Sequence, residues 1–295
     1  MIRTAAVVAP AKVNLTLRVL SKRPDGYHEL DTLFQAIDLA DDVVVRLGGR
    51  GVALRVRGAV PAAEPENLAY RAAEKLREEA GFSGGVEVVL TKRIPAGAGL
   101  GGGSSDGAAV LKCLAALLDI APDDERLRRI ALELGSDVPF FLSQGALARG
   151  RGRGEVLTAL PALPEADLVV VSPPVHASTA WAYRALAAEL PGTGAETLPG
   201  GLRTVPETWA EVASSAHNDF QELVSSGHPE VARSLGALRD AGARLALLSG
   251  SGSSSFGLFD DRASAERAAA ALQDELGWPC RPARTLVEQP VPRVT

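Results

Sequence analysis

The segment "RIPAGAGLGGGSSDGAAVLKCL", residues 93–114, constrains the fold of this chain more than any other stretch of its sequence. Five of the seven residues 97–103 are glycine, and they lie between an expected strand, 86–92, and an expected helix, 105–118. Glycines let a ligand approach the backbone closely. The start of a helix offers free N–H groups and a partial positive charge, and Ser-Ser-Asp is expected to cap it. The segment therefore predicts a phosphate-binding loop between strand and helix.

Two common nucleotide-binding motifs fit this segment only in part. Gly97, Gly99 and Gly102 match G-x-G-x-x-G. The dinucleotide fold, however, also needs a second strand that ends in an acidic residue about 20 positions later, whereas residues 105–134 predict two helices joined by a turn. A P-loop would need a lysine where Gly103 stands. A loop that holds a transferable phosphate needs cations around it, and here they must come from elsewhere in the chain.

The composition narrows the class of protein. The 295 residues are 46% hydrophobic and 23% charged, with a net charge of -5 and a pI near 5.5. This balance favours a globular protein and argues against a general binder of nucleic acid or membrane surfaces. No signal-peptide core and no run of ~20 apolar residues is present, so we expect a cytoplasmic protein. Cys113 and Cys280 are too few for a disulfide framework or a zinc site and are expected to be reduced thiols.

The hydrophobic pattern predicts a mixed α+β chain. In the first half it predicts two strands, 43–47 and 52–57, paired across the turn "GGRG", and a helix that Asn67 caps and Gly81 ends. In the second half it predicts strands at 168–171, 245–248, 256–259 and 284–287 and helices at 178–189, 231–241 and 263–276. The Pro- and Gly-rich residues 191–206 predict a long surface loop. Prolines near 158–165 mark a boundary, so we expect domains at 1–160 and 161–295.

Polar residues in three other places could supply the chemistry. Lys12 and Asn14 share one face of an expected strand. Asp137 lies between a helix end and the apolar run "VPFFL", where its orientation and pKa can be controlled. Lys12 and Asp137 are therefore a candidate cation and base, although a solvent-facing lysine and a capping aspartate are the ordinary alternatives. The loop "LSGSGSSSF", residues 248–256, could bind oxygens through its backbone N–H groups.

Three motifs in this order resemble those of the kinase superfamily named for galactokinase, homoserine kinase, mevalonate kinase and phosphomevalonate kinase. They are "PAKVNL", "PAGAGLGGGSSD" and "LSGSGSSSF". Within the superfamily, "RPDGYHELDTLFQ", "GSDVPFFL", "GALARGRGRGE" and "HNDFQ" resemble the family of 4-diphosphocytidyl-2-C-methyl-D-erythritol kinases, which act in the non-mevalonate isoprenoid pathway. The resemblance spans residues 9–259. It implies an α+β fold of two domains, an N-terminal ATP-binding domain and a C-terminal domain, with the active site in the cleft between them.

The resemblance also implies roles for individual residues. The reaction would pass the γ-phosphoryl group of ATP to a hydroxyl of a cytidine-diphosphate-linked methylerythritol, with Asp137 taking the hydroxyl proton and Lys12 keeping that aspartate ionised. Ser104 or Ser105 would lie near Mg²⁺. The residues expected to bind ATP are Pro95, Ala96, Gly97, Ala98, Gly99, Leu100, Gly101, Gly102, Gly103, Ser104 and Ser105. Those expected to bind the second substrate are Asn14, Tyr27, His28, Tyr183, Gly250, Ser251 and Gly252.

Tyr27 and His28 are expected to recognise the cytosine, one by stacking and the other by hydrogen bonding. For the aromatic on the other side of the base, "PPVHASTAWAY" offers His176, Trp181 and Tyr183, of which Tyr183 is preferred.

The competing interpretations are other small-alcohol kinases of the same fold, a nicotinamide oxidoreductase and a non-catalytic binding protein. "DGYHEL" argues against the first, because those substrates carry no cytosine. We expect small-molecule substrates, no nucleic acid or membrane partner, and a monomer or homodimer.

Overall fold

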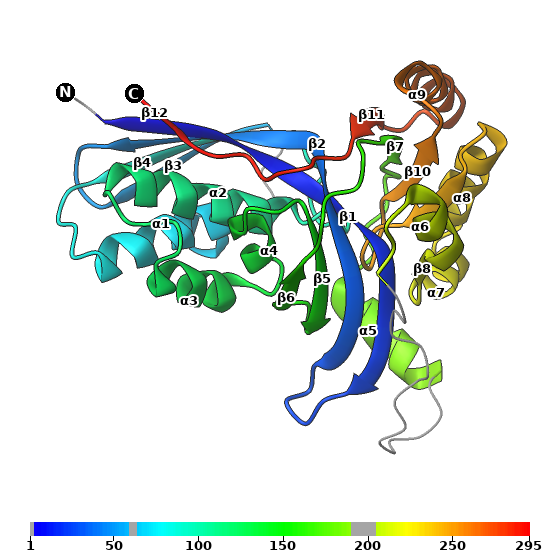
Figure 1. The fold of residues 1–295 in the computed structure, drawn as a ribbon, viewed down its shortest axis with the longest axis horizontal. Coiled ribbons are helices and arrows are strands. Elements are labelled where there is room, and N and C mark those ends of the chain that lie inside the picture. The colour runs from blue at the N-terminus through cyan, green and yellow to red at the C-terminus, as the bar shows by residue number, and fades with distance from the viewer. Residues whose placement is uncertain (1–2, 59–63, 190–204) are drawn as a thin grey trace.

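The structure, a computed structural model, describes residues 3–58, 64–189 and 205–295 as a mixed α+β protein with two sheets (Figure 1). The expected loop 191–206 lies outside the described residues except for its last two. The strands are β1 Thr4–Lys22, β2 His28–Leu47, β3 Val52–Arg57, β4 Val86–Thr91, β5 Leu147–Gly152, β6 Val156–Ala159, β7 Asp167–Val171, β8 His217–Asn218, β9 Leu245–Leu248, β10 Ser255–Phe259, β11 Cys280–Arg284 and β12 Arg293–Val294. The helices are α1 Leu68–Glu79, α2 Gly102–Leu117, α3 Glu125–Leu134, α4 Val138–Leu142, α5 Thr179–Glu189, α6 Trp209–Ser215, α7 Gln221–Gly227, α8 Pro229–Asp240 and α9 Arg262–Leu276, with a 3-10 turn at Glu64–Glu66.

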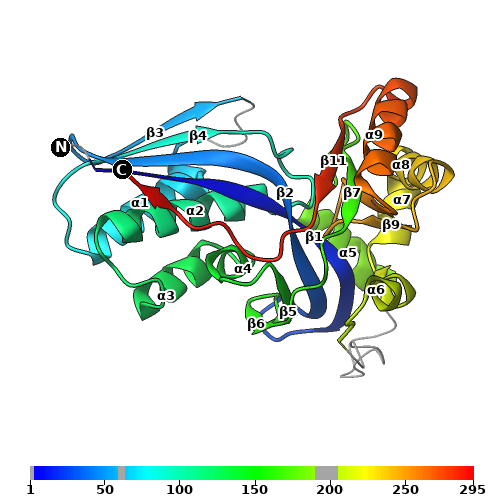
Figure 2. The ribbon, with the colours of Figure 1, turned by 45° about the horizontal axis from the view of Figure 1, so that its top comes forward.

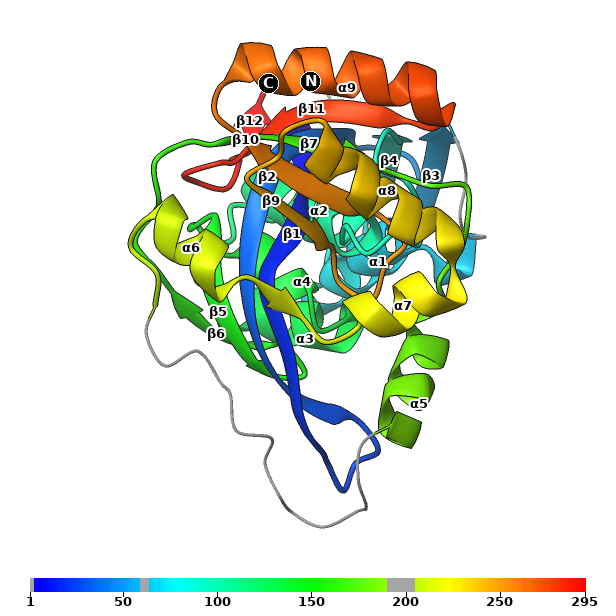
Figure 3. The same cartoon turned by 90° about the vertical axis from the view of Figure 1, so that its right-hand side faces the viewer.

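The larger sheet has the order β12-β1-β2-β4-β3, with β5 and β6 continuing from β2 and β8 pairing with β1. Helices α1 to α4 cover one of its faces (Figure 2), and their apolar residues share a core with β1, β2 and β4. The smaller sheet, β11-β7-β10-β9, packs against α8 and α9 (Figure 3). The larger sheet thus belongs mainly to the first half of the chain, and the smaller sheet to the second.

The two halves meet along β1. A third core joins Ala11, Val13 and Leu15 of β1 to strands of the smaller sheet, so this stretch of β1 is buried on both faces. Beyond it, β1 and β2 continue as a ribbon, which β5 joins by pairing with residues 30–35 of β2 and which α5 flanks on the other side (Figures 1 and 3). One continuous strand therefore passes from the first sheet, through the junction, to an exposed hairpin.

Much of the expected secondary structure is confirmed. Asn67 caps α1 by accepting a hydrogen bond from the Ala69 N–H at 2.9 Å, and Gly81 after the helix has a φ of +64°. Val86, Val88 and Leu90 share the buried face of β4. Residues 102–134 form two helices with no intervening strand, which excludes the dinucleotide fold. Cys113 and Cys280 are free and buried, as expected.

The prediction that the strands at 43–47 and 52–57 pair with each other is wrong. β4 lies between β2 and β3, antiparallel to β2 and parallel to β3. The turn "GGRG" bends around the start of β4, where the Gly85 N–H donates to the Gly49 carbonyl and the Val86 N–H donates to the Gly51 carbonyl. A Cβ on Gly85 would come within 2.4 Å of a backbone oxygen of this turn. The turn therefore encloses a glycine and forms no hairpin.

Two element boundaries also differ from the prediction. α2 begins at Gly102, three residues early, and its N-cap is Gly101 with a φ of +71°, so Ser-Ser-Asp lies inside the first turn and does not cap the helix. A Cβ on Gly101 would lie 2.9 Å from the Phe141 ring, so the entry to α2 is set by close packing. The strand expected at 284–287 is instead β11, Cys280–Arg284, which can contain Pro282 because it is an edge strand of the smaller sheet. No helix in the described part of the chain could cross a membrane.

Candidate active site

A cavity of about 960 Å³ lies where the β1–β2 ribbon, the glycine-rich loop, α5 and the second Gly/Ser loop meet. Most of the predicted site residues line it. They are Lys12, Asn14, Tyr27, His28, residues 95–104, Asp137, Tyr183, Gly250 and Ser251. Residues from both halves of the chain, more than 200 positions apart, therefore meet in one cavity.

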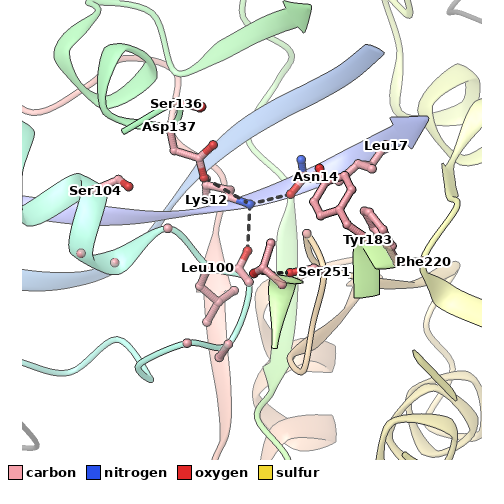
Figure 4. A pocket seen from close by; sticks show the side chains of 18 of the residues that line it. Lys12, Asn14, Leu17, Leu100, Ser104, Ser136, Asp137, Tyr183, Phe220 and Ser251 are labelled. Carbon is pink, nitrogen blue, oxygen red and sulfur yellow. Dashed lines mark hydrogen bonds and ion pairs between the residues drawn. The ribbon is translucent and has the colours of Figure 1, made fainter. Parts of the chain in front are cut away.

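Lys12 and Asp137 face each other near the middle of this cavity (Figure 4). The Lys12 Nζ lies 3.9 Å from an Asp137 carboxylate oxygen and donates hydrogen bonds to Asn14 Oδ1 at 2.6 Å and to the Gly99 carbonyl at 2.8 Å. Lys12 is only 4% exposed. Burial lowers the pKa of Lys12, and the charge of Asp137 partly opposes this. The lysine is thus held by three oxygens, with its ammonium directed at the carboxylate.

The glycine-rich loop is shaped by positive backbone angles and by contact with the second loop. Gly97, Gly99 and Gly101 have φ between +63° and +78°, a region that side chains disfavour. A Cβ on Gly99 would lie 2.0 Å from the Ser249 carbonyl oxygen. The Gly99 carbonyl accepts from the Ser249 hydroxyl at 3.0 Å as well as from Lys12. The first N–H groups of α2 follow directly, which makes the loop suitable for phosphate oxygens.

A charge cluster below this loop was missed by the sequence reasoning. The Lys92 ammonium donates to Asp106 at 2.6 Å and to Asp41, and all three side chains are buried. Burial lowers the pKa of Lys92, but the neighbouring Asp106 and Asp41 have the larger combined effect, so the pKa of Lys92 is raised. Burial, with the charge of Asp41, raises the pKa of Asp106 to about 8 although Lys92 opposes it. The lysine that follows β4 is therefore already bound by carboxyl groups of the protein.

The opposite end of the cavity is built from rings. Tyr27 is 54% exposed, and the Arg153 guanidinium lies 4.7 Å from the centre of its ring. His28 stacks on Tyr183 with ring centres 5.0 Å apart and planes 26° apart, and Tyr183 packs edge-on against Phe220. Burial lowers the pKa of His28, helped by the charge of Lys22, and burial raises the pKa of Tyr183. His28 is thus favoured in its neutral form, which can both donate and accept a hydrogen bond.

The "HNDFQ" segment, residues 217–221, lines the cavity through Phe220 and also holds one of its loops in place. The Asn218 amide donates hydrogen bonds at 2.8 Å to the Leu248 and Gly250 carbonyls, and its oxygen accepts from the Phe220 N–H. β8, which contains Asn218, pairs with β1. This asparagine therefore fixes the second Gly/Ser loop to the strand that carries Lys12 and Asn14.

Three predicted candidates lie away from the cavity. Ser105 is 1% exposed, and its hydroxyl makes no hydrogen bond within the described residues. Gly252 faces Leu248 and Val224, and Trp181 packs against Gly227. Of the aromatic alternatives, His176 lines the cavity beside Gly97 and Tyr183 lines it beside His28, so only Tyr183 lies with the rings.

The chain matches two family models, described as "GHMP kinases N terminal domain" over residues 67–145 and "GHMP kinases C terminal" over residues 203–277. These matches cover the glycine-rich loop with Asp137, and the segment that contains Asn218 and the second Gly/Ser loop. The β1–β2 ribbon and α5, which also line the cavity, lie outside both matches.

Individual proteins resemble the chain over nearly its whole length. The protein named 4-diphosphocytidyl-2-C-methyl-D-erythritol kinase from Citrifermentans bemidjiense is 42% identical over 287 residues, which cover 95% of this chain and 98% of that protein. A crystal structure of 4-(cytidine 5'-diphospho)-2C-methyl-D-erythritol kinase matches with a TM-score of 0.74 and 41% identity, covering 95% of this chain and 98% of the other. Homoserine kinase from Cytophaga hutchinsonii shares the fold, with a TM-score of 0.70 at 21% identity, over 99% and 97% of the two chains.

Proposed function

The chain belongs to the 4-diphosphocytidyl-2-C-methyl-D-erythritol kinase family of GHMP kinases, and from this premise we propose that it transfers the γ-phosphoryl group of ATP to the 2-hydroxyl of 4-diphosphocytidyl-2-C-methyl-D-erythritol. The product is the 2-phosphate, an intermediate of the non-mevalonate isoprenoid pathway. The observation that carries the assignment of roles is the position of the Lys12–Asp137 pair, between a glycine-rich helix start and a cluster of rings.

In this proposal Asp137 is the catalytic base. It is the only carboxylate among the described residues that line the cavity, so it is the natural acceptor for the hydroxyl proton. As the proton moves to Asp137, the hydroxyl oxygen forms its bond to the γ-phosphorus and the bond to the ADP oxygen breaks. Lys12 stabilises the negative charge on the transferred group and on Asp137, because its ammonium is buried and faces both.

ATP phosphates are assigned to the backbone of residues 97–104. The N–H groups at the start of α2 are free to donate, and the glycines leave room for close approach. The described residues contain no cluster of three or more His, Cys, Asp or Glu side chains suited to a metal. We expect Mg²⁺ to enter with ATP, whose phosphate charge it neutralises, and Ser104 is the loop hydroxyl that lines the cavity and could hold it.

Cytosine recognition is assigned to the ring end of the cavity. Tyr27 offers an exposed ring for stacking, and neutral His28 offers both a donor and an acceptor. Tyr183 supports His28 by stacking on it, and Asn14 lies beside Lys12, where the methylerythritol hydroxyls are expected.

The division into domains at 1–160 and 161–295, the cytoplasmic location and the monomeric or homodimeric state stay predictions.

A coupled assay of ADP release tests the assignment. Purified protein with MgATP is given 4-diphosphocytidyl-2-C-methyl-D-erythritol, the nucleotide-free methylerythritol phosphate, mevalonate or homoserine. We expect ADP release with the first acceptor only. Equal release with mevalonate or homoserine would show that the ring end does not select the substrate, and release with none of the four would contradict the kinase assignment.

A further inference from the structure

The turn between β5 and β6 lies between the two parts of the acceptor site. A Cβ on Gly154 would lie 4.0 Å from an Asp137 carboxylate oxygen, so this residue adjoins the proposed base. The residue before it, Arg153, places its guanidinium over the Tyr27 ring and lines the cavity. A ligand that reaches from Asp137 to Tyr27 must therefore pass this turn.

The turn has a fixed conformation. Gly152 and Gly154 have φ of +69° and +105°, which favour glycine at both positions. The Gly152 N–H donates to Glu29 of β2 at 3.0 Å, and the Arg153 N–H donates to Glu155 at 2.5 Å. The backbone that carries the Arg153 side chain is thus tied to the β1–β2 ribbon, which limits the positions that the guanidinium can reach.

The charges around the cavity are compensated unevenly. Five basic side chains line it: Lys12, Lys22, Lys92, Arg153 and Arg184. Lys12 faces Asp137, and Lys92 is bound by Asp41 and Asp106. Within the described part of the chain, Arg153 forms one ion pair, a long one of 3.5 Å with Glu155, and its charge also acts on Asp25, while neither Lys22 nor Arg184 forms an ion pair. The positive charge that lacks a close partner therefore lies at the ring end of the cavity. It is away from the glycine-rich loop, to which the ATP phosphates are assigned.

We propose that Arg153 binds the diphosphate that links the cytidine to the methylerythritol, and so determines the preference for a diphosphate-linked acceptor. The inference rests on the proposed function. A ligand with its hydroxyl at Asp137 and its base at Tyr27 carries its two phosphates in the stretch between them, beside Arg153. A guanidinium suits this task because its planar set of N–H donors binds phosphate oxygens in pairs while one face stays on an aromatic ring. Lys22 and Arg184 are exposed and add long-range attraction.

Equilibrium binding of cytidine diphosphate and of cytidine, measured by calorimetry, tests the proposal without catalysis. Charge-assisted hydrogen bonds to phosphate are strong, so Arg153→Gln should weaken cytidine diphosphate binding roughly 10- to 100-fold and change cytidine binding less than about twofold. Arg153→Lys should retain part of the affinity for the diphosphate. The matched control is Arg151→Gln, since Arg151 is exposed, lies two residues earlier and does not line the cavity.

Steady-state kinetics supply a second readout. Arg153→Gln should raise the KM for 4-diphosphocytidyl-2-C-methyl-D-erythritol, with little change in kcat or in the KM for ATP. If Arg153→Gln weakened the binding of cytidine and of cytidine diphosphate equally, Arg153 would act on the base and the proposal would be overturned. If it weakened neither, the proposal would be overturned as well. If the unmodified protein bound neither ligand, the cytidine part of the proposed function would fail as well, so the two failures are distinguishable.

Discussion

The two ends of the cavity differ in the groups that line them: backbone N–H groups at one end and side chains at the other. At the glycine-rich end, the first backbone N–H groups of α2 are free to donate, and the nearby lysine, Lys92, is bound by Asp41 and Asp106. At the ring end, side chains line the cavity, and its cations have few or no ion-pair partners among the residues that the structure describes. A backbone surface can hold any nucleotide triphosphate, whereas rings and unpaired cations can distinguish one acceptor from another. In the proposed function, binding of the phosphoryl donor and choice of the acceptor are thus separated in space, and Lys12 and Asp137 lie between them.

The largest effect is expected where the two ends meet. Asp137→Asn removes the proposed base but keeps the size of the side chain, so kcat should fall roughly 10²- to 10⁴-fold. Binding of ATP and of cytidine diphosphate should persist, because neither end is altered. Steady-state kinetics and calorimetry measure both quantities, with the exposed Asp123→Asn as the control. A folded Asp137→Asn protein with near-normal turnover would remove Asp137 from the mechanism.

The next effect concerns the glycine-rich end. Gly99→Ala would bring a Cβ to 2.0 Å from the Ser249 carbonyl oxygen, so the two loops must move apart. A displacement of about 1 Å in such a site can cost roughly 100-fold, and we expect a loss of that size in kcat/KM for ATP. Gly81→Ala is a matched control, because Gly81 also has a positive φ, of +64°, but has open space around it. Equal losses in the two variants would mean that backbone strain, and not loop contact, is responsible.

A smaller effect is expected at the ring end. Base stacking on an aromatic ring contributes about 1 to 3 kcal/mol, so Tyr27→Ala should raise the KM for the cytidine-linked acceptor roughly tenfold or more. The KM for ATP should not change. Tyr27→Phe keeps the ring and should behave like the unmodified protein. An unaltered acceptor KM in Tyr27→Ala would exclude the stacking role and weaken the contrast between the two ends.

The last effect, on stability and not on binding or turnover, concerns the buried carboxyl groups that bind Lys92. The folded protein keeps a proton on Asp106 up to about pH 8, whereas the unfolded chain loses it near pH 4. The folded state therefore binds more protons between these values, and this group lowers the free energy of unfolding as pH rises, by at most ~1.4 kcal/mol per pH unit. Urea unfolding from pH 5 to pH 8 should show a flatter profile for Asp106→Asn than for the unmodified protein. Parallel profiles would show that Asp106 does not titrate in this range.

The sequence allowed the main elements and most of the residues that line the cavity to be predicted. Lys12, Asp137 and the glycine-rich loop stand in local patterns, an alternating strand, a helix end and a strand-to-helix connection, and such patterns can be recognised from neighbouring residues. The start of α2 could not be predicted in this way, because the contact of Gly101 with Phe141 sets it and no capping side chain does.

The features that could not be predicted depend on contacts between residues that are far apart in the sequence. Asp41, Lys92 and Asp106 come together through the pairing of β2 with β4 and the packing of α2, over separations of 51 and 14 residues. Arg153 reaches Tyr27 because β5 pairs with β2. The insertion of β4 between β2 and β3 likewise depends on sheet order, which alternation within a single strand does not encode.

The most direct test of the separation between donor binding and acceptor choice is to measure the binding of both ligands to a variant of each end. Calorimetry would measure the affinity of a non-hydrolysable ATP analogue and of cytidine diphosphate for Gly99→Ala, Tyr27→Ala and the double variant. The account predicts that Gly99→Ala weakens only the ATP analogue, that Tyr27→Ala weakens only cytidine diphosphate, and that the double variant shows both losses without coupling. A variant that weakened both ligands alike would contradict the separation of donor binding from acceptor choice.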